Sequence, residues 1–439
     1  MNKIRKLFLG FWLTGLFICV VLSCTSVRFV EDLSAYQTKI NSLAARIKAD
    51  STDAPAWRDL GVIYFQARRY TPADSSLQRA FAGDARDPKT IFYLGMTREF
   101  QGNIEQALPF YERYKDVARL SPYRRLMAGR YHQLTLDLTR QEIRTLLQQE
   151  QQLSEARMSP QAVAVFPLRY LGKDKKFAPL GKGISEMIIG DLGQVRAIKL
   201  LERVRLQALL DEMALAKSAS FDQSTAPRLG KVLGAGRIVS GAYNVVGKDQ
   251  LQIDVLSWDV INRNFPTAAT EAEALQNIFR LEKALVFNVI ADMGIELTPE
   301  EREKIQFIPT QSLQAFLAYS RGLEQEDAGQ FEAAAGFYQQ ALQLDPNFGA
   351  AANKAETAQS VSAAGGSKEN VLVVVQKVDP PLAAESPTSQ SDLVTERLKN
   401  LGLNAGSNFV PGEDNRKPAE EVDKAYGDLR TPPSPPPRQ

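Results

Sequence analysis

The sequence feature that most constrains the fold is an internal repeat near the N-terminal end of the chain. Seven positions recur 34 residues apart: Trp57, Leu60, Gly61, Tyr64, Ala73, Leu77 and Ala80 match Ile91, Leu94, Gly95, Arg98, Ala107, Tyr111 and Tyr114. The small residues let two helices pack closely, and the large ones fill the space between neighbouring units. Because one helical hairpin cannot bury its apolar face alone, this period predicts a stack of hairpins.

The same internal spacing returns near the C-terminus. Gly322 precedes Ala334 by twelve positions, as the equivalent glycine precedes its alanine in the first copy. A period of 34 residues that opens with the pattern W-x2-L-G-x2-Y resembles the tetratricopeptide (TPR) repeat. The resemblance covers residues 51–122 and 311–352 and implies helical hairpins in both places. The alternative is a set of amphipathic hairpins whose spacing agrees by coincidence.

Helical stretches at 32–49 and 123–157 are expected to cap the first two copies, because two adjacent repeats are fewer than a stable solenoid usually needs. The expected N-terminal helical domain therefore spans residues 51–157. A C-terminal TPR unit follows much later, over residues 311–352.

The TPR resemblance implies a concave groove lined by the first helix of each hairpin. The side chains outside the packing pattern, which we expect to bind partners there, are Arg58, Val62, Phe65, Gln66, Phe92, Met96, Glu99 and Phe100. Three phenylalanines make this face more aromatic than a solvated surface needs, and hydrophobic grooves bind peptides or helices. The alternative is that these phenylalanines pack against neighbouring helices.

Between the helical regions, the pattern changes to alternating strands and helices. Strands are predicted at 162–166, 198–204, 237–246 and 250–259, and helices at 181–192, 205–217, 226–233 and 273–293. The first strand is a continuous apolar run, which indicates burial on both faces. A hairpin with Gly247 in its turn closes the sheet. This alternation predicts an α/β domain over residues 158–300.

Short segments of this domain agree in order and spacing with the core of the CsgG/HfaB family. The matching segments are Ala164–Leu168, Gly183–Met187, Asp191–Leu192, Leu201–Arg203, Leu233–Ala235 and Ile238–Gly241. The resemblance spans 161–295 and implies a mixed sheet of the curli-assembly type. The family includes an outer-membrane curli-secretion lipoprotein whose long inserted hairpins build a membrane barrel. This chain has no room for such insertions between its strands, so no pore is expected.

The expected fold class is therefore α plus α/β, with TPR hairpins flanking a CsgG-like α/β domain that has a mixed sheet. Residues 353–439 shift to Ser, Ala, Gly and Pro, and we expect a mostly disordered tail. Within that tail, the apolar run Val371–Val375 is expected to be a lone strand that adds to a sheet edge or to a partner.

The N-terminus carries an export signal. Lys3, Arg5 and Lys6 precede an apolar run that ends in Val21-Leu22-Ser23-Cys24. This ending resembles the lipobox of bacterial lipoproteins, which implies a signal peptide over residues 1–23 and a tether with a first helix over 24–50. It also implies diacylglyceryl and N-acyl (palmitate) groups on Cys24.

Thr25 follows the cysteine where the family's sorting rule would place Asp in a protein retained at the inner membrane. The resemblance therefore implies a lipid anchor at the periplasmic face of the outer membrane. The alternatives are a signal cleaved elsewhere or an uncleaved anchor.

Composition limits the chemistry that the chain can perform. Once the signal is removed, Cys24 is the only cysteine, so neither a disulfide framework nor a cysteine metal site is expected. His132 is the only histidine, which argues against a zinc site or a histidine-based catalytic triad. The formal charge of +2 gives no field that would attract nucleic acid. We expect no enzymatic activity, no cofactor and no metal.

Two short motifs have structural interpretations. Glu202-Arg203 follows a predicted strand, and we expect the arginine to cap the strand end or to bridge a carboxylate there; the alternative is a catalytic pair. Gly181-Lys182-Gly183-Ile184-Ser185 lacks the phosphate-loop spacing and is interpreted as the start of a helix.

These features together predict a membrane-anchored periplasmic scaffold or assembly lipoprotein. Its partners would be envelope proteins or peptides of a secretion, appendage or cell-wall system, bound through the TPR groove, and the outer membrane, bound through the lipid. One alternative is a homo-oligomeric outer-membrane secretion-channel subunit of the curli-transport type. Another is an activator of a cell-wall synthase.

Overall fold

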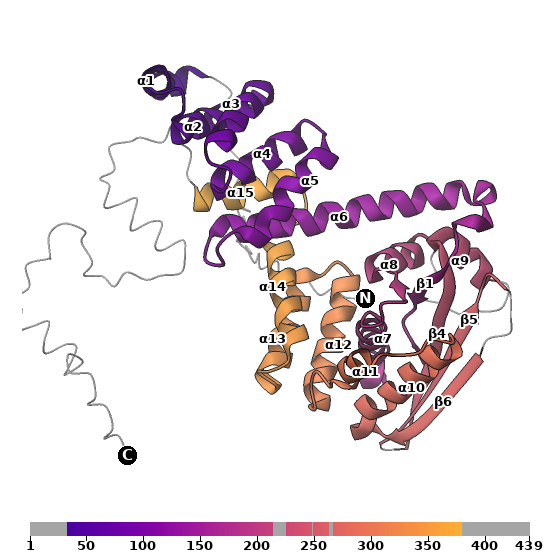
Figure 1. The fold of residues 1–439 in the computed structure, drawn as a ribbon. Helices are drawn as coiled ribbons and strands as arrows, with labels where there is room; N and C mark the ends of the chain where they lie inside the picture. The colour runs from indigo at the N-terminus through magenta and orange to yellow at the C-terminus, as the bar shows by residue number, and fades with distance from the viewer. Residues whose placement is uncertain (1–32, 214–224, 248, 263–266, 380–439) are drawn as a thin grey trace, which may run out of the picture.

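The computed structural model describes residues 33–213, 225–247, 249–262 and 267–379. Helical hairpins at both ends of this region flank an α/β domain with a mixed sheet (Figure 1). The predicted fold class is therefore confirmed. The predicted signal peptide, Cys24 and the Pro-rich end of the chain after residue 379 lie outside the described residues. Within the ranges that are described, no helix combines the length and the apolar character that crossing a membrane requires.

The N-terminal half is a stack of helices. Its members are α1 (Gln37–Ala49), α2 (Ala54–Gln66), α3 (Tyr70–Gly83), α4 (Pro88–Phe100), α5 (Ile104–Glu112) and α6 (Pro122–Gln148). The 34-residue period extends to the helix caps, because Asp53 and Asp87 accept hydrogen bonds from the backbone N–H groups of Ala56 and Thr90. A proline follows each cap within the first turn, where its missing N–H costs no helical hydrogen bond.

The repeated glycines mark the points of closest helix approach. A Cβ at Gly61 would lie 2.6 Å from Cγ of Leu77, and a Cβ at Gly95 would lie 2.6 Å from the ring of Tyr111. Both distances are far below van der Waals contact, so only glycine fits. The repeat therefore sets the distance between the two helices of each hairpin, as the sequence predicted.

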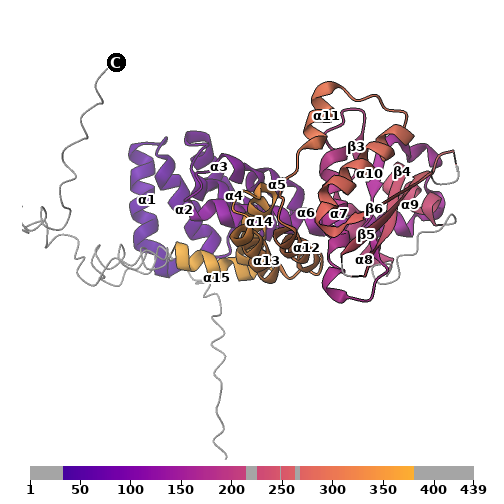
Figure 2. The same cartoon turned by 90° about the horizontal axis from the view of Figure 1, so that it is seen from below.

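The helices at the C-terminal end continue the same stack. They are α12 (Leu313–Asp327), α13 (Phe331–Leu344) and α14 (Gly349–Ala364). Helix α14 packs along the 27-residue helix α6, and a Cβ at Gly129 would collide with the carbonyl of Ser360. Two helical regions that the α/β domain separates in sequence thus meet side by side (Figures 1 and 2).

The α/β domain is built around a six-stranded sheet. Its strands are β1 (Ser159–Val165), β2 (Arg169–Tyr170), β3 (Lys199–Leu200), β4 (Ala235–Val246), β5 (Gln250–Asp259) and β6 (Thr267–Ala274). The order is β3-β1-β4-β5-β6, with β2 paired to β4 off this path. Strand β1 is parallel to β3 and β4, whereas β4, β5 and β6 form antiparallel pairs.

Helices cover both faces of this sheet. They are α7 (Leu180–Leu192), α8 (Arg203–Glu212), α9 (Ala226–Leu233), α10 (Ile278–Asp292) and α11 (Pro299–Gln306). Val163 and Val165 of β1 share an apolar cluster with α7 and α10, whereas Ala164 and Phe166 share one with α8 and α9. Alternate residues of β1 therefore face opposite layers, which confirms the predicted strand with two buried faces.

The C-terminal TPR unit shares its core with the α/β domain. Phe316 and Tyr319 of α12 belong to the same apolar cluster as Ile184 of α7, and α12 packs directly on α7. On the opposite side, the last turns of α6 pack on α8, where Ile143 is fully buried. The helical stack thus contacts the α/β domain at two places, through α12 on α7 and through α6 on α8 (Figure 1).

The structure differs from the sequence-based prediction at three places. Residues 267–274 form strand β6, although one helix was predicted over 273–293. Strand β3 has two residues rather than seven, because Glu202 already caps α8. Residues 368–378 form helix α15 (Lys368–Val378), so the predicted strand at Val371–Val375 is wrong. The chain is also helical through most of 353–378, so any tail begins later than predicted.

Candidate protein-binding site

The predicted groove residues do not form an open surface. Four apolar members are almost fully buried, with exposed fractions of 0–1%: Val62, Phe65, Phe92 and Met96. Glu99 is also buried, and only Arg58, Gln66 and Phe100 are half-buried. The expectation of an exposed, solvent-lined groove is therefore wrong. The alternative, that the phenylalanines pack against neighbouring helices, describes them better.

Helix α15 lies along α4, the helix that carries the groove residues Phe92, Met96, Glu99 and Phe100. Val371, Leu372 and Val375 lie in the same apolar cluster as the buried side chains of α2 and α4, and each is at most 4% exposed. Helix α15 packs on α4, although nearly 270 residues separate the two in sequence. Figure 2 shows α15 lying beside the N-terminal helices, apart from the α/β domain.

A carboxylate at the end of α15 enters a polar clamp. Asp379 lies 2.8 Å from Nζ of Lys89 and accepts hydrogen bonds from the hydroxyls of Tyr123 at 2.9 Å and Tyr93 at 3.3 Å. Burial, followed by the charge of Asp379, raises the pKa of both tyrosines. Both hydroxyls therefore stay protonated and act as donors to the carboxylate.

The other end of α15 is fixed by contacts to the predicted groove residues Glu99 and Phe100. Nζ of Lys368 lies 4.8 Å from the ring centre of Phe100, a cation–π geometry. Glu99 forms a buried ion pair with Arg130 of α6, and Arg130 also donates to the carbonyl of Gly366 at 2.7 Å. Glu99 thus holds the arginine that fixes the turn before α15, rather than facing solvent.

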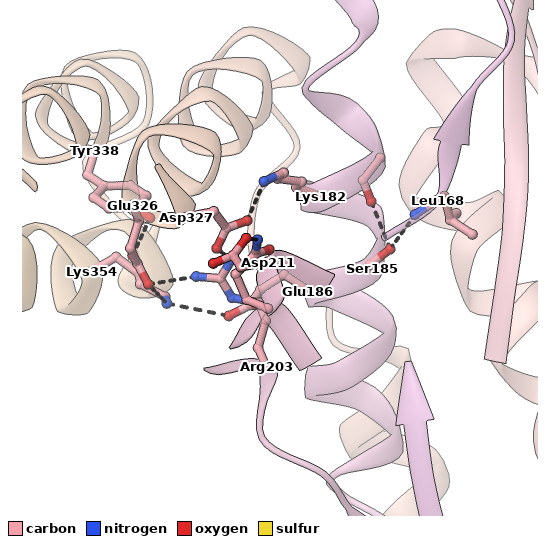
Figure 3. Close-up of polar contacts among 12 residues, drawn as sticks. Leu168, Lys182, Ser185, Glu186, Arg203, Asp211, Glu326, Asp327, Tyr338 and Lys354 are labelled. Atoms are coloured by element: carbon pink, nitrogen blue, oxygen red, sulfur yellow. Dashed lines mark hydrogen bonds and ion pairs between the residues drawn. The ribbon is translucent and has the colours of Figure 1, made fainter. Parts of the chain in front are cut away.

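A second polar cluster joins the α/β domain to the C-terminal TPR unit (Figure 3). Arg203, the first residue of α8, lies 3.2 Å from Glu186 of α7 and 2.6 Å from Glu326 of α12, and it also pairs with Asp327. The prediction that this arginine bridges a carboxylate is confirmed. Its partners Glu326 and Asp327 lie more than 120 residues away in sequence.

Lysines from both sides complete this junction cluster, which we define as Lys182, Glu186, Arg203, Glu326, Asp327 and Lys354. Lys182 of α7 pairs with Asp327, and Lys354 of α14 lies 2.9 Å from Glu326. Burial opposes ionisation of Glu326, but Lys354 and Arg203 outweigh it and lower its pKa to about 2. Glu326 is therefore charged at neutral pH, and the cluster links four helices.

The glycine motif at the start of α7 serves packing. A Cβ at Gly183 would lie 2.8 Å from the ring of Phe316 on α12, so the missing side chain brings α7 and α12 together. Ser185 accepts a hydrogen bond from the backbone N–H of Leu168 at 3.0 Å and donates to the carbonyl of Gly181 at 2.8 Å. The interpretation of this motif as a helix start is confirmed, since α7 begins at Leu180.

His132 lies next to the junction cluster. Its ring packs against Tyr114 and Tyr131, and it lines a small cavity of about 100 Å³ together with Arg203 and Glu326. Burial lowers the pKa of His132, which keeps the imidazole neutral. Among the side chains that the structure describes, no three histidine, cysteine or acidic groups are placed to share a metal ion.

Comparison with known families agrees with this architecture. Residues 144–246, from the last turns of α6 to the end of β4, match the family described as curli production assembly/transport component CsgG. Residues 317–348, which cover α13 and most of α12, match the tetratricopeptide repeat. The chain thus combines a CsgG-like domain with a TPR repeat. The resemblance to the CsgG family and the C-terminal TPR resemblance are confirmed. No curated protein matches the chain.

Proposed function

We propose that the protein is a membrane-anchored scaffold that assembles protein partners of an envelope machine at the periplasmic face of the outer membrane. The observation that carries this proposal is the close packing of two modules. The junction cluster and helix α6 fix the CsgG-like domain against the helical stack. TPR repeats bind proteins, and the matched CsgG family is described by curli assembly and transport.

The proposed anchor is a lipid on Cys24. Eight residues separate Cys24 from Leu33, where the described helices begin, and a fully extended chain spans at most about 3.5 Å per residue step, or roughly 30 Å here. A lipid at that position holds the N-terminal helices within reach of the membrane. Tethering also raises the effective concentration of the scaffold for partners at the same surface.

A second candidate function is a subunit of an oligomeric secretion channel, which the CsgG match favours. Several copies would then have to assemble around a common axis. The mass of the detergent-extracted full-length protein, measured by light scattering, separates the two candidates. A monomer or dimer supports the scaffold, whereas a ring of many copies supports the channel.

The anchor is tested with a Cys24→Ala variant. Cells that express the wild type or the variant are fed an alkyne-tagged palmitate and then fractionated. We expect the wild type to carry the label and to sediment with the outer membrane, and the variant to lose both properties. An unlabelled wild type, or a variant that stays in the membrane with unchanged mobility, contradicts the lipoprotein proposal.

The scaffold role is tested by cross-linking in the same cells, followed by identification of the bound proteins. An Arg203→Met variant removes the fixed orientation of the two modules, while Arg280→Met removes an exposed arginine as a control. We expect discrete cross-linked partners for the wild type and the control, and fewer for Arg203→Met. The same products from all three proteins would contradict a role for the fixed orientation.

A further inference from the structure

Helix α15 binds its groove as a separate ligand would. It contributes three aliphatic side chains at helical spacing, Val371, Leu372 and Val375, followed by the carboxylate of Asp379 one turn later. Amphipathic helices that bind apolar grooves use the same arrangement of anchors on one face. The groove therefore recognises a short helix with an aliphatic face and an acidic C-terminal end.

The connection of α15 to α14 is short, and the hydrogen bond from Arg130 to the carbonyl of Gly366 holds it. Only residues 365–367 separate it from α14, and Gly366 has a φ of +71°, which glycine adopts without strain. The helix has 11 residues, a length at which an isolated helix is barely stable in water. Its helical form therefore depends on the groove, and leaving the groove means losing the helix.

We propose that α15 is an intramolecular occupant of the TPR groove and that a partner's amphipathic helix of the same chemistry displaces it. This inference rests on the proposed scaffold function and names its partner class: a helix with two or three aliphatic residues over one turn and a carboxylate one turn later. In the closed state, the groove is occupied by α15. In the open state, the partner's carboxylate takes the place of Asp379 between Lys89, Tyr93 and Tyr123.

The carboxylate clamp supplies the selectivity of this exchange. Tyr93 is 1% exposed, so its hydroxyl loses its partner when Asp379 leaves and no other acceptor arrives. A buried donor left without an acceptor is costly, whereas a matching carboxylate restores the bond. The groove therefore discriminates against apolar helices that lack an acidic end, in the way that polar sites reject analogues without the matching group.

The test uses the full-length protein in detergent and a fluorescein-labelled peptide with the sequence of residues 367–379. An opened variant, Val371→Asp with Val375→Asp, disrupts the aliphatic face of α15 and leaves the groove unchanged. We expect this variant to bind the peptide at least about tenfold more tightly than the wild type, because apparent affinity scales with the fraction of open molecules. Binding is measured by fluorescence anisotropy.

Two matched controls probe the clamp. A peptide with Asp379→Asn should bind the opened variant more weakly than the native peptide does. Adding Tyr123→Phe to the opened variant should weaken binding of the native peptide and leave binding of the Asn peptide nearly unchanged. Equal peptide affinity for the wild type and a folded opened variant, or no binding to either, overturns the proposal.

Amide hydrogen exchange of the wild-type protein tests whether a peptide displaces α15, and it needs no variant that could misfold. We expect the amides of α15 to exchange faster than those of α14, and faster still when unlabelled peptide saturates the groove. Protection of α15 equal to that of α14, unaffected by peptide, overturns the proposal. These measurements do not involve Cys24 or cellular partners. If partners are cross-linked in cells but the peptide does not displace α15 in vitro, the proposed scaffold function is supported and only the displacement of α15 is refuted.

Discussion

The α15 groove and the junction cluster both join segments that are distant in sequence, but they do so by different physical means. The groove holds α15 through three aliphatic side chains, the carboxylate of Asp379 at one end, and the contacts of Lys368 and Gly366 at the other. The junction holds α12 against α7 and α8 through three cations and three carboxylates, next to a continuous apolar core. A single short helix held by a few side chains can be released and replaced. A buried network of charges cannot lose a member without leaving others unpaired.

The largest effect should follow from breaking the junction. Replacement of Arg203 by Met leaves Glu186, Glu326 and Asp327 without their shared cation, and removal of one partner of a buried pair costs about 3–5 kcal/mol. The matched control is Arg280→Met, because Arg280 is 71% exposed and pairs with Glu273 at the surface, where a pair contributes about 0–1 kcal/mol. Urea unfolding compares the two. Equal losses would show that the junction is no more important than a surface pair.

Acid should weaken the junction selectively. The pKa of Glu326 lies at about 2 in the folded chain, below its ordinary value of 4.5. The contribution of Glu326 to the free energy of unfolding is therefore fully present above pH 4.5 and is lost as the pH falls towards 2. This contribution amounts to roughly 3 kcal/mol at most. A Glu326→Gln variant should be less stable than the wild type at pH 7, and the difference should shrink as the pH approaches 2. Unfolding curves with parallel pH dependence for both proteins would contradict this.

Close helix packing should matter more than helix propensity. A Cβ at Gly322 would collide with the ring of Tyr338, so Gly322→Ala should destabilise the C-terminal hairpin by about 1–3 kcal/mol through overpacking. Gly336 lies on the neighbouring helix with nothing within 4 Å of its Cβ position, and Gly336→Ala should stabilise by about 0.5–1 kcal/mol. A lower unfolding temperature for Gly322→Ala and a higher one for Gly336→Ala would confirm the close contact between Gly322 and Tyr338. Two stabilising substitutions would show that Tyr338 moves aside.

Local patterns predicted much of the fold because local physics determines those parts. The apolar run at 162–166 became a strand buried on both faces, and Gly234 ends α9 in the left-handed conformation that glycine favours. The repeated glycines correctly placed the hairpins. Strand β6 escaped prediction because its sequence, Thr-Ala-Ala-Thr-Glu-Ala-Glu-Ala, has few β-branched residues, and it forms by pairing with β5.

The candidate site was harder to predict because its occupant is distant in sequence. Nothing in the sequence of α4 indicates that residues 368–378 pack on it, so the groove residues were interpreted as a binding surface. The valine run of α15 favours a strand by propensity, yet Ser367 caps the helix by accepting from the backbone N–H of Asn370. That cap, with Glu369 in the first turn and Lys377 in the last, is the signal that could have identified the helix.

The smallest expected effect distinguishes the groove from the junction most sharply. Tyr123→Phe removes one hydroxyl from the Asp379 clamp and leaves Lys89 and Tyr93 in place. Loss of one hydrogen bond to a charged group costs about 1.5–3 kcal/mol when the contact must persist. Since α15 can leave the groove, most of this loss should appear as faster hydrogen exchange in α15, with a global unfolding midpoint close to that of the wild type. A global unfolding midpoint that falls as far as the loss of this hydrogen bond requires would show that α15 unfolds only with the whole chain. The contact of α15 with its groove would then be as stable as the junction.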